Sequence, residues 1–221
     1  METMKRPGLH AGWLAGVVFT VALAVVAAIT PGYEHAHQPV SFLGMHGAPF
    51  ALSWNLFGFG LPGLLVACFA LSLQAALAHR GVGAVARIGT WLLLISGVAF
   101  AGNGVFAFDP QATGGTSTRL HVAMLTISLL AFLPSAAMLA VGLRRLQGWR
   151  WLATLGPLLA LGTLASVLQR ITDVVPALQG NPGYAQRITL ALYFLWMLLA
   201  AVVALRATHR APAMATSGAL R

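Results

Sequence analysis

The stretch GWLAGVVFTVALAVVAAIT, residues 12–30, has no charged side chain and is about as long as a helix that crosses the hydrocarbon layer of a bilayer. Five further apolar runs follow, and the six together cover roughly residues 11–31, 54–79, 84–107, 120–144, 149–170 and 186–208. Of the 221 residues, 58% are hydrophobic and 8% are charged, whereas a soluble domain carries roughly 25% charged residues. The sequence therefore predicts an all-α, polytopic membrane bundle of six transmembrane helices.

Basic residues are unevenly divided between the two ends of this predicted bundle. Arg119, Arg170 and Arg187 fall at one end, and the other ten Lys and Arg residues fall at the opposite end: Lys5, Arg6, Arg80, Arg87, Arg144, Arg145, Arg150, Arg206, Arg210 and Arg221. Short loops rich in Lys and Arg stay in the cytoplasm, so both termini are predicted to be cytoplasmic. This topology accounts for the formal charge of +9. We expect no nucleic-acid partner, because no basic face with interleaved aromatic residues is apparent.

The predicted topology divides the chain into three parts. Residues 1–10 would form a cytoplasmic N-terminal tail, and residues 11–208 would form the transmembrane domain with a structured outer loop at 32–53. Residues 209–221 are rich in Ala, Pro, Ser and Thr, and we expect them to be a disordered cytoplasmic tail.

Glycine and proline residues interrupt the second and third spans. Prominent among them are Gly58, Gly60, Pro62, Gly63, Gly97, Gly102 and Gly104. Small residues are common where membrane helices pack closely, and prolines and glycines also mark kinks. Either the two helices pack tightly here, or their kinks open a cavity toward the outer loops.

The outer loop holds the densest run of ionisable side chains, from Tyr33 to His46. Its apolar part would form a short helix capped by Ser41 and lying over the mouth of the bundle. His35, His37 and His46 are suitable ligands for zinc or a similar metal, which would be a possible cofactor. Alternatively, these histidines are simply hydrated at the level of the lipid headgroups.

Two further polar positions follow the third span. Asp109 precedes a proline and either ends the helix in a turn or belongs to a site. Asn103 would lie one turn below it and would join the same cavity. His121 stands just inside the fourth apolar run. It would make either a helix–helix hydrogen bond or a ligand contact.

Arginines at the predicted outer end are a third candidate cluster. Arg170 and Asp173 are three residues apart and would form an ion pair. Alternatively, Arg119, Arg170 and Arg187 together would bind a phosphate or carboxylate, which suits an anionic lipid headgroup or a small amphiphile. Tyr33 and Asn55 would line the same site.

Three motifs carry a resemblance to a known family. They are Tyr33 with Pro39, Val40, Ser41, Leu43 and Gly44; Asn55 with Gly58; and Asp109-Pro110 followed by His121. Over roughly residues 12–200 the chain resembles a bacterial and archaeal membrane family catalogued as domain of unknown function nine-nine-eight. The resemblance implies a six-span fold in a prokaryotic cytoplasmic membrane but no activity. It favours Ser41, Asp109 and His121 as the shared polar residues.

Two functions of different classes follow from these observations. In the first, an outward-facing polar cavity binds a lipid headgroup or small amphiphile, and membrane lipids are the partners. In the second, the protein is a membrane-embedded hydrolase or transferase acting on lipid, with Ser41, Asp109 and His121 or a His-bound metal as the catalytic groups. The enzyme hypothesis predicts that these three side chains meet within hydrogen-bonding distance. The binding hypothesis predicts that the three outer arginines converge.

Overall fold

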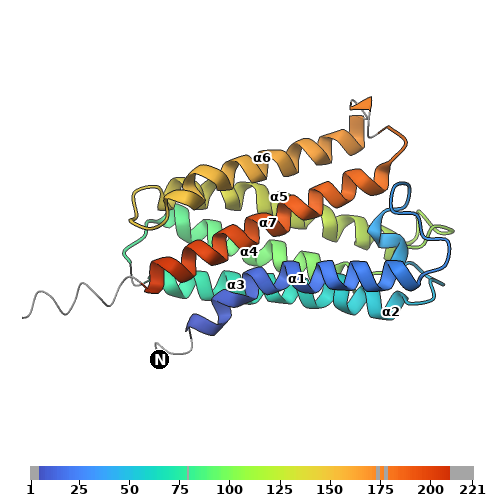
Figure 1. Ribbon diagram of the computed structural model, residues 1–221, viewed down its shortest axis with the longest axis horizontal. Helices are drawn as coiled ribbons and strands as arrows, with labels where there is room; N and C mark the ends of the chain where they lie inside the picture. Colours follow the sequence, from blue (N-terminus) through green and yellow to red (C-terminus); the bar gives the residue numbers. More distant parts are fainter. Residues whose placement is uncertain (1–4, 79, 173–174, 177–178, 210–221) are drawn as a thin grey trace, which may run out of the picture.

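The computed structural model describes residues 5–78, 80–172, 175–176 and 179–209 (Figure 1). Within them, six helical segments are long and apolar enough to cross a membrane. Five are single helices: α1 (Lys5–Ile29), α4 (Ala84–Gly102), α5 (Thr116–Leu143), α6 (Arg150–Thr172) and α7 (Pro182–His209). The sixth joins α2 (Ala51–Trp54), the π-helix η2 (Asn55–Gly60) and α3 (Leu61–Ala78). The described chain contains no strand, so the all-α, six-helix prediction is confirmed.

The long helices pack side by side in a closed ring. Helix α3 packs against α4, α4 against α5, α5 against α6, and α6 against α7. Helix α1 closes the ring by packing against both α3 and α7. In Figure 1 the segment after α1 lies at one end of the bundle, and the start of α1 lies at the other. We call the end that carries residues 30–50 the outer end, following the predicted topology, and the opposite end the inner end.

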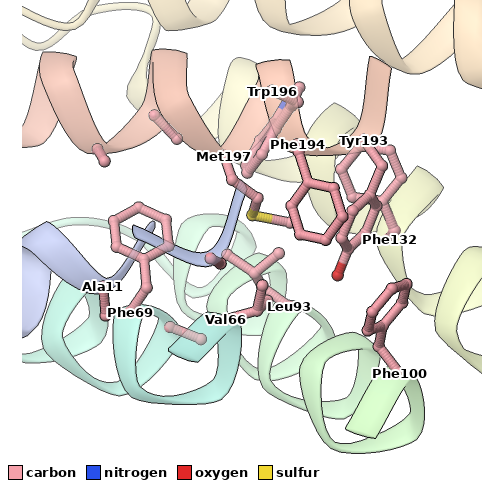
Figure 2. Close-up of a cluster of buried hydrophobic side chains, with 14 of the residues drawn as sticks. Ala11, Val66, Phe69, Leu93, Phe100, Phe132, Tyr193, Phe194, Trp196 and Met197 are labelled. Carbon is pink, nitrogen blue, oxygen red and sulfur yellow. The ribbon is translucent and has the colours of Figure 1, made fainter. Parts of the chain in front are cut away.

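Aromatic side chains fill the middle of the ring (Figure 2). Phe100 of α4 stacks on Tyr193 of α7 with ring centroids 5.7 Å apart, and Phe132 of α5 meets the edge of the same tyrosine at 4.8 Å. The Tyr193 hydroxyl lies 3.1 Å from Ser96 Oγ, which gives this buried polar atom a partner. The centre is therefore a packed core, and large apolar residues cover the outside where lipid would serve as the solvent: Val21, Leu130, Leu158 and Leu161 are more than half exposed.

Glycines bring α3 and α4 into backbone contact. A Cβ atom added at Gly63 would lie 2.3 Å from Ala101 N and 2.6 Å from Gly97 O, and one added at Gly97 would lie 2.6 Å from Ala67 N. No side chain fits at such distances. At this crossing Gly63 and Gly97 therefore allow the two helices to pack tightly. Tight packing was one of the two alternatives that the sequence left open for the glycines of these spans.

We expect Gly63→Ala to destabilise the protein by about 1–3 kcal/mol, because the added methyl group would push the two backbones apart. The matched control is Gly114→Ala in an exposed turn, where the nearest atom to the added Cβ is Arg119 Nη2 at 3.9 Å, so the expected change stays within about 0.5 kcal/mol. Thermal unfolding of the detergent-purified proteins, followed by tryptophan fluorescence, measures both. Equal midpoints would contradict the assignment of Gly63 to a tight crossing.

Some predicted boundaries were wrong. The third span was expected to continue to residue 107, but α4 ends at Gly102 with Asn103 as its C-cap. Just after the end of the helix, Gly104 lies against the π-helix: a Cβ on Gly104 would be 2.3 Å from Asn55 O. Helix α1 begins at Lys5, so part of the predicted N-terminal tail is helical. Of the predicted tail at 209–221, residues 210–221 lie outside the described residues.

Candidate functional site

Arg187, in the second turn of α7, attaches the outer loop to the bundle. Its Nη1 donates hydrogen bonds to the carbonyl oxygens of His35 (2.6 Å), Gln38 (3.1 Å) and Gly183 (2.9 Å). Its Nη2 donates to Tyr33 Oη at 2.5 Å, and the guanidinium carbon lies 5.5 Å from the centre of the tyrosine ring. We call this set of five residues the Arg187 latch. In the sequence it spans more than 150 residues, so it is a purely tertiary feature.

The loop backbone is fixed directly over the start of α7. Ala36 O accepts hydrogen bonds from two donors in the first turn of the helix, Gly183 N (2.9 Å) and Tyr184 N (3.3 Å). The Tyr184 N–H is shared with Asn181 O at 3.1 Å. The Val40 N–H donates to Gln186 Oε1 at 2.6 Å. A Cβ at Gly183 would lie 2.4 Å from His35 O, so only glycine lets the loop approach this closely.

The surroundings of the latch shift the pKa of two loop side chains, Tyr33 and His35. Burial raises the pKa of the Tyr33 hydroxyl, an effect that the positive charge of Arg187 partly offsets. Tyr33 therefore stays a neutral phenol whose oxygen accepts from Arg187. Burial and then the charge of Arg187 both lower the pKa of the His35 imidazole, so this ring is neutral at physiological pH.

The histidines of the outer loop do not gather around one point. His37 Nδ1 lies 3.1 Å from Gly180 O, its Nε2 lies 4.0 Å from the exposed Glu34 carboxylate, and the His46 side chain is exposed. Across the part of the chain that the structure describes, no group of three His, Cys, Asp or Glu side chains is placed to hold a metal ion. The geometry thus provides no support for a metal site at His35, His37 and His46.

A second polar group lies at the outer ends of α4 and α5. His121 is 5% exposed, its Nδ1 is 2.8 Å from Phe106 O, and its ring packs edge-on against Phe59 with centroids 5.7 Å apart. Asn103 is fully buried, and its Nδ2 donates to the carbonyls of Ala99 and Phe100 while its Oδ1 has no hydrogen-bond partner. Both side chains serve mainly to end α4 and hold the following loop.

Asn55 and Asp109 hold backbone turns. Asn55 Nδ2 donates to Gly44 O at 2.9 Å, which joins the π-helix to the outer loop. The Asp109 carboxylate accepts the backbone N–H groups of Gln111 (2.9 Å) and Ala112 (3.2 Å). An Asp-Pro sequence favours such a turn, but it lies in the loop between α4 and α5 and not at the end of α4, where the sequence predicted it.

Ser41 does not cap a helix, contrary to the prediction. It lies inside the short 3₁₀ helix η1 (Val40–Gly44), whose N-cap is Pro39 and which has no side-chain capping bond. No hydrogen bond joins any two of Ser41, Asp109 and His121, all of which are described residues. Asp109 is engaged by its own loop and His121 by Phe106. The arrangement therefore does not have the nucleophile–base–orienter contacts of a hydrolase.

Of the three arginines in the predicted cluster, the structure describes the side chains of Arg119 and Arg187. Arg119 is exposed, and its side chain makes no hydrogen bond or ion pair with the described residues. Arg170 belongs to α6 but its side chain is outside the described part, as is the whole of Asp173, so the Arg170–Asp173 pair stays a prediction. Of the two described side chains, Arg187 contacts the loop.

Gln38, Gly183 and Gln186 also hold this site, and the sequence analysis did not identify them. The sequence does contain one indication of this site, because the polar pair Gln186 and Arg187 stands in an otherwise apolar helix, and Gln186 is buried.

An apolar groove of about 600 Å³ runs between α1 and α7, inward from Arg187. We call it the α1–α7 groove, and it is lined by Trp13, Gly16, Val17, Phe19, Thr20, Val21, Leu23, Arg187, Ala191, Phe194, Leu195 and Leu198. Arg187 is the one charged residue among these. A second apolar groove of about 510 Å³ lies on the other side of α1, against Phe50, Ser53, Phe57 and Leu61, and has no charged residue in its lining.

Comparison with known proteins places the chain in a family. Residues 13–203 match the family described as "Protein of unknown function (DUF998)", and this range includes most of every candidate membrane helix. No curated protein and no solved structure matches the chain. The extent of the family match agrees with the resemblance that the Tyr33–Gly44, Asn55 and Asp109–His121 motifs indicated. The protein is therefore a member of the DUF998 family with six helices suited to crossing a membrane.

Proposed function

We propose that this protein binds an anionic amphiphile at the outer end of the α1–α7 groove, with the apolar chain in the groove and the anionic head at Arg187. The observation that carries this proposal is that Arg187 has no anionic partner among the described residues. It carries a positive charge, no carboxylate of the described chain pairs with it, and its Nε is buried without a hydrogen-bond acceptor. A charged group at the edge of a bilayer is costly unless it is paired or hydrated. An anion entering the groove would supply the negative charge that the hydrogen-bond partners of Arg187 lack.

The lining of the groove suits an alkyl chain. Its volume lies within the range of about 300–1,000 Å³ typical of small-molecule sites. Space is available because small residues face it on both helices, Gly16 on α1 and Ala191 one turn below Arg187 on α7. The groove opens toward the surroundings of the bundle, so a lipid would enter laterally from the membrane.

The Arg187 latch would preorganise the site. The guanidinium is already oriented by three carbonyl oxygens and the Tyr33 hydroxyl, so little side-chain entropy would be lost when a ligand binds. These partners are neutral dipoles and leave the net charge in place. The electrostatic attraction for an anionic head therefore remains, and it is strengthened by the low dielectric constant of the neighbouring apolar groove.

The test is to fill the groove without touching Arg187. We expect Ala191→Phe to lower retention of oleate, measured by native mass spectrometry of the detergent-purified protein, by about tenfold, which corresponds to about 1.4 kcal/mol of binding free energy. Ser53→Phe is the matched control, because it adds the same ring to the other apolar groove. Methyl oleate has the same chain without the charge and should be retained less well than oleate by the wild type.

Two outcomes would contradict the proposal. If Ala191→Phe and Ser53→Phe retain oleate equally, the α1–α7 groove is not the site. If oleate and methyl oleate are retained equally by the wild type, Arg187 does not recognise the head.

A further inference from the structure

A separate pocket of about 460 Å³ lies at the inner end, where the α5–α6 connection meets the end of α7. We call it the inner pocket. Its lining consists of Gln147, Gly148, Arg150, Trp151, Leu199, Val202, Val203, Arg206 and Ala207. None of these residues belongs to the Arg187 latch or to the α1–α7 groove, so any ligand here would be bound independently of the outer site.

Two arginines line the polar part of the inner pocket. Arg150 begins α6 and Arg206 lies in the last turn of α7, and both side chains are exposed. Neither guanidinium has a hydrogen bond or an ion pair within the described residues. Three of the four acidic residues in the sequence, Glu34, Asp109 and Asp173, follow spans that end at the outer side. Two like charges that face one pocket without a carboxylate favour an anion between them.

The other part of the inner pocket is apolar and continues into the membrane layer. Leu199 precedes Arg206 by seven residues, so it lies about 10 Å deeper along α7. Val202 and Val203 line the space in between. Trp151, 64% exposed, stands at the level of the arginines, where tryptophan is enriched in membrane proteins. A ligand that fits must therefore be anionic at one end and apolar at the other.

The walls of the inner pocket are held in place by the fold. Gly148 has a φ of +87°, which lets the chain turn back toward α7, and a Cβ placed there would be 3.4 Å from that of Ala207. The next residue, Trp149, is fully buried and anchors the turn in the core. Arg80 Nη2 donates to Ala207 O at 2.7 Å and fixes the end of α7 from the opposite side. The two arginines are thus carried by fixed helix ends.

We infer that the inner pocket binds an anionic phospholipid of the cytoplasmic leaflet, with its phosphate between Arg150 and Arg206 and an acyl chain over Leu199 and Val202. Phosphate is the anionic group that the inner leaflet supplies in quantity, and juxtamembrane arginines attract anionic lipids. The apolar extension distinguishes this ligand from free phosphate, which would not use it. This inference goes beyond the proposed function, because it concerns another ligand at the opposite end of the bundle.

The experiment measures lipid retention by native mass spectrometry after reconstitution in nanodiscs that contain equal amounts of phosphatidylglycerol and phosphatidylcholine. We expect the wild type to retain phosphatidylglycerol preferentially. The double substitution Arg150→Gln with Arg206→Gln should reduce that preference by about tenfold. The matched control is Arg144→Gln with Arg145→Gln, which removes the same charge at the same end outside the pocket, and it should keep the preference. A second variant, Val202→Trp, fills the apolar part and should also reduce retention.

The remaining outcomes separate the alternatives. Equal loss in both double variants would mean that the net charge, not the pocket, attracts the lipid, and it would overturn the inference. Loss in the Arg150/Arg206 variant with none in Val202→Trp would indicate a site for a phosphate group alone and would also overturn it. Ala191→Phe should leave phosphatidylglycerol retention unchanged. Failure at the outer groove and failure at the inner pocket are therefore distinguishable.

Discussion

Replacing Arg187 with alanine is expected to release the outer loop and to lower the free energy of unfolding by about 3 kcal/mol, because hydrogen bonds from a charged donor contribute roughly 1.5–3 kcal/mol each. The substitution removes the hydrogen bonds that Arg187 donates to the carbonyls of His35 and Gln38 and to the hydroxyl of Tyr33, and it leaves Gln38 O only the 3.3 Å contact from Tyr33 Oη. Thermal unfolding of the purified protein measures the loss of stability. Limited proteolysis of the segment at 31–50 measures release of the loop.

The conservative substitution and the control make this prediction specific. Arg187→Lys keeps the charge, but an ammonium group cannot reproduce the planar fork that reaches Tyr33 and the carbonyls together, so we expect only partial recovery. Arg119→Ala removes an exposed arginine at the same end of the bundle, whose side chain has no partner among the described residues, and should change stability by no more than about 0.5 kcal/mol. If Arg187→Ala were as stable and as protease-resistant as Arg119→Ala, the latch would not hold the loop.

The second large effect is expected at His121. His121→Ala removes a 5% exposed side chain that bonds to Phe106 O and packs between Phe59 and Phe108. The lost hydrogen bond and the cavity together should cost about 2–4 kcal/mol. The loop after α4 would lose its attachment to α5. Thermal unfolding and hydrogen exchange at residues 103–109 measure the two effects.

His10→Ala is the control for this substitution. His10 is exposed at the inner end and only accepts a hydrogen bond from Trp13 Nε1, so a small effect is expected. His121→Asn provides a test of the mechanism, because the amide N–H can take the place of the ring Nδ1–H toward Phe106 O and should restore part of the stability. Equal effects of His121→Ala and His10→Ala would contradict the role assigned to His121.

The candidate residues differ in how far the sequence alone could assign them. For His121 the sequence leaves open a hydrogen bond or a ligand contact, because an imidazole inside an apolar run must find a partner, and the structure supplies Phe106 O, a backbone atom of the preceding loop. For Asp109 the sequence leaves open a turn or a site, and in the structure its carboxylate holds a turn of the kind that Asp before Pro favours. Ser41 was misjudged as a cap because one serine among apolar residues matches the pattern. The helix begins one residue earlier, after Pro39.

The arginines show where sequence reasoning ends. Arg119, Arg170 and Arg187 are equivalent in the sequence, as each stands at the outer end of an apolar run. Arg187 differs from the others through its hydrogen-bond acceptors, which are mainly backbone carbonyls. Every residue has a backbone carbonyl, so the sequence does not indicate which ones an arginine will contact. The α1–α7 groove cannot be read from the sequence for the same reason, because it is lined by Gly16 and Ala191 on two helices at opposite ends of the chain.

The sequence by itself determined that the chain forms six apolar helices and predicted which ends of them lie in the cytoplasm. It could do so because membrane insertion depends on the local run of side chains and on the charge of each short loop. Only the tertiary structure decided that the helices close into a ring, that Arg187 holds the outer loop, and that Arg150 and Arg206 face one pocket. These features arise from contacts between segments far apart in the chain, which are selected by shape and by backbone hydrogen bonding rather than by any local pattern of residues.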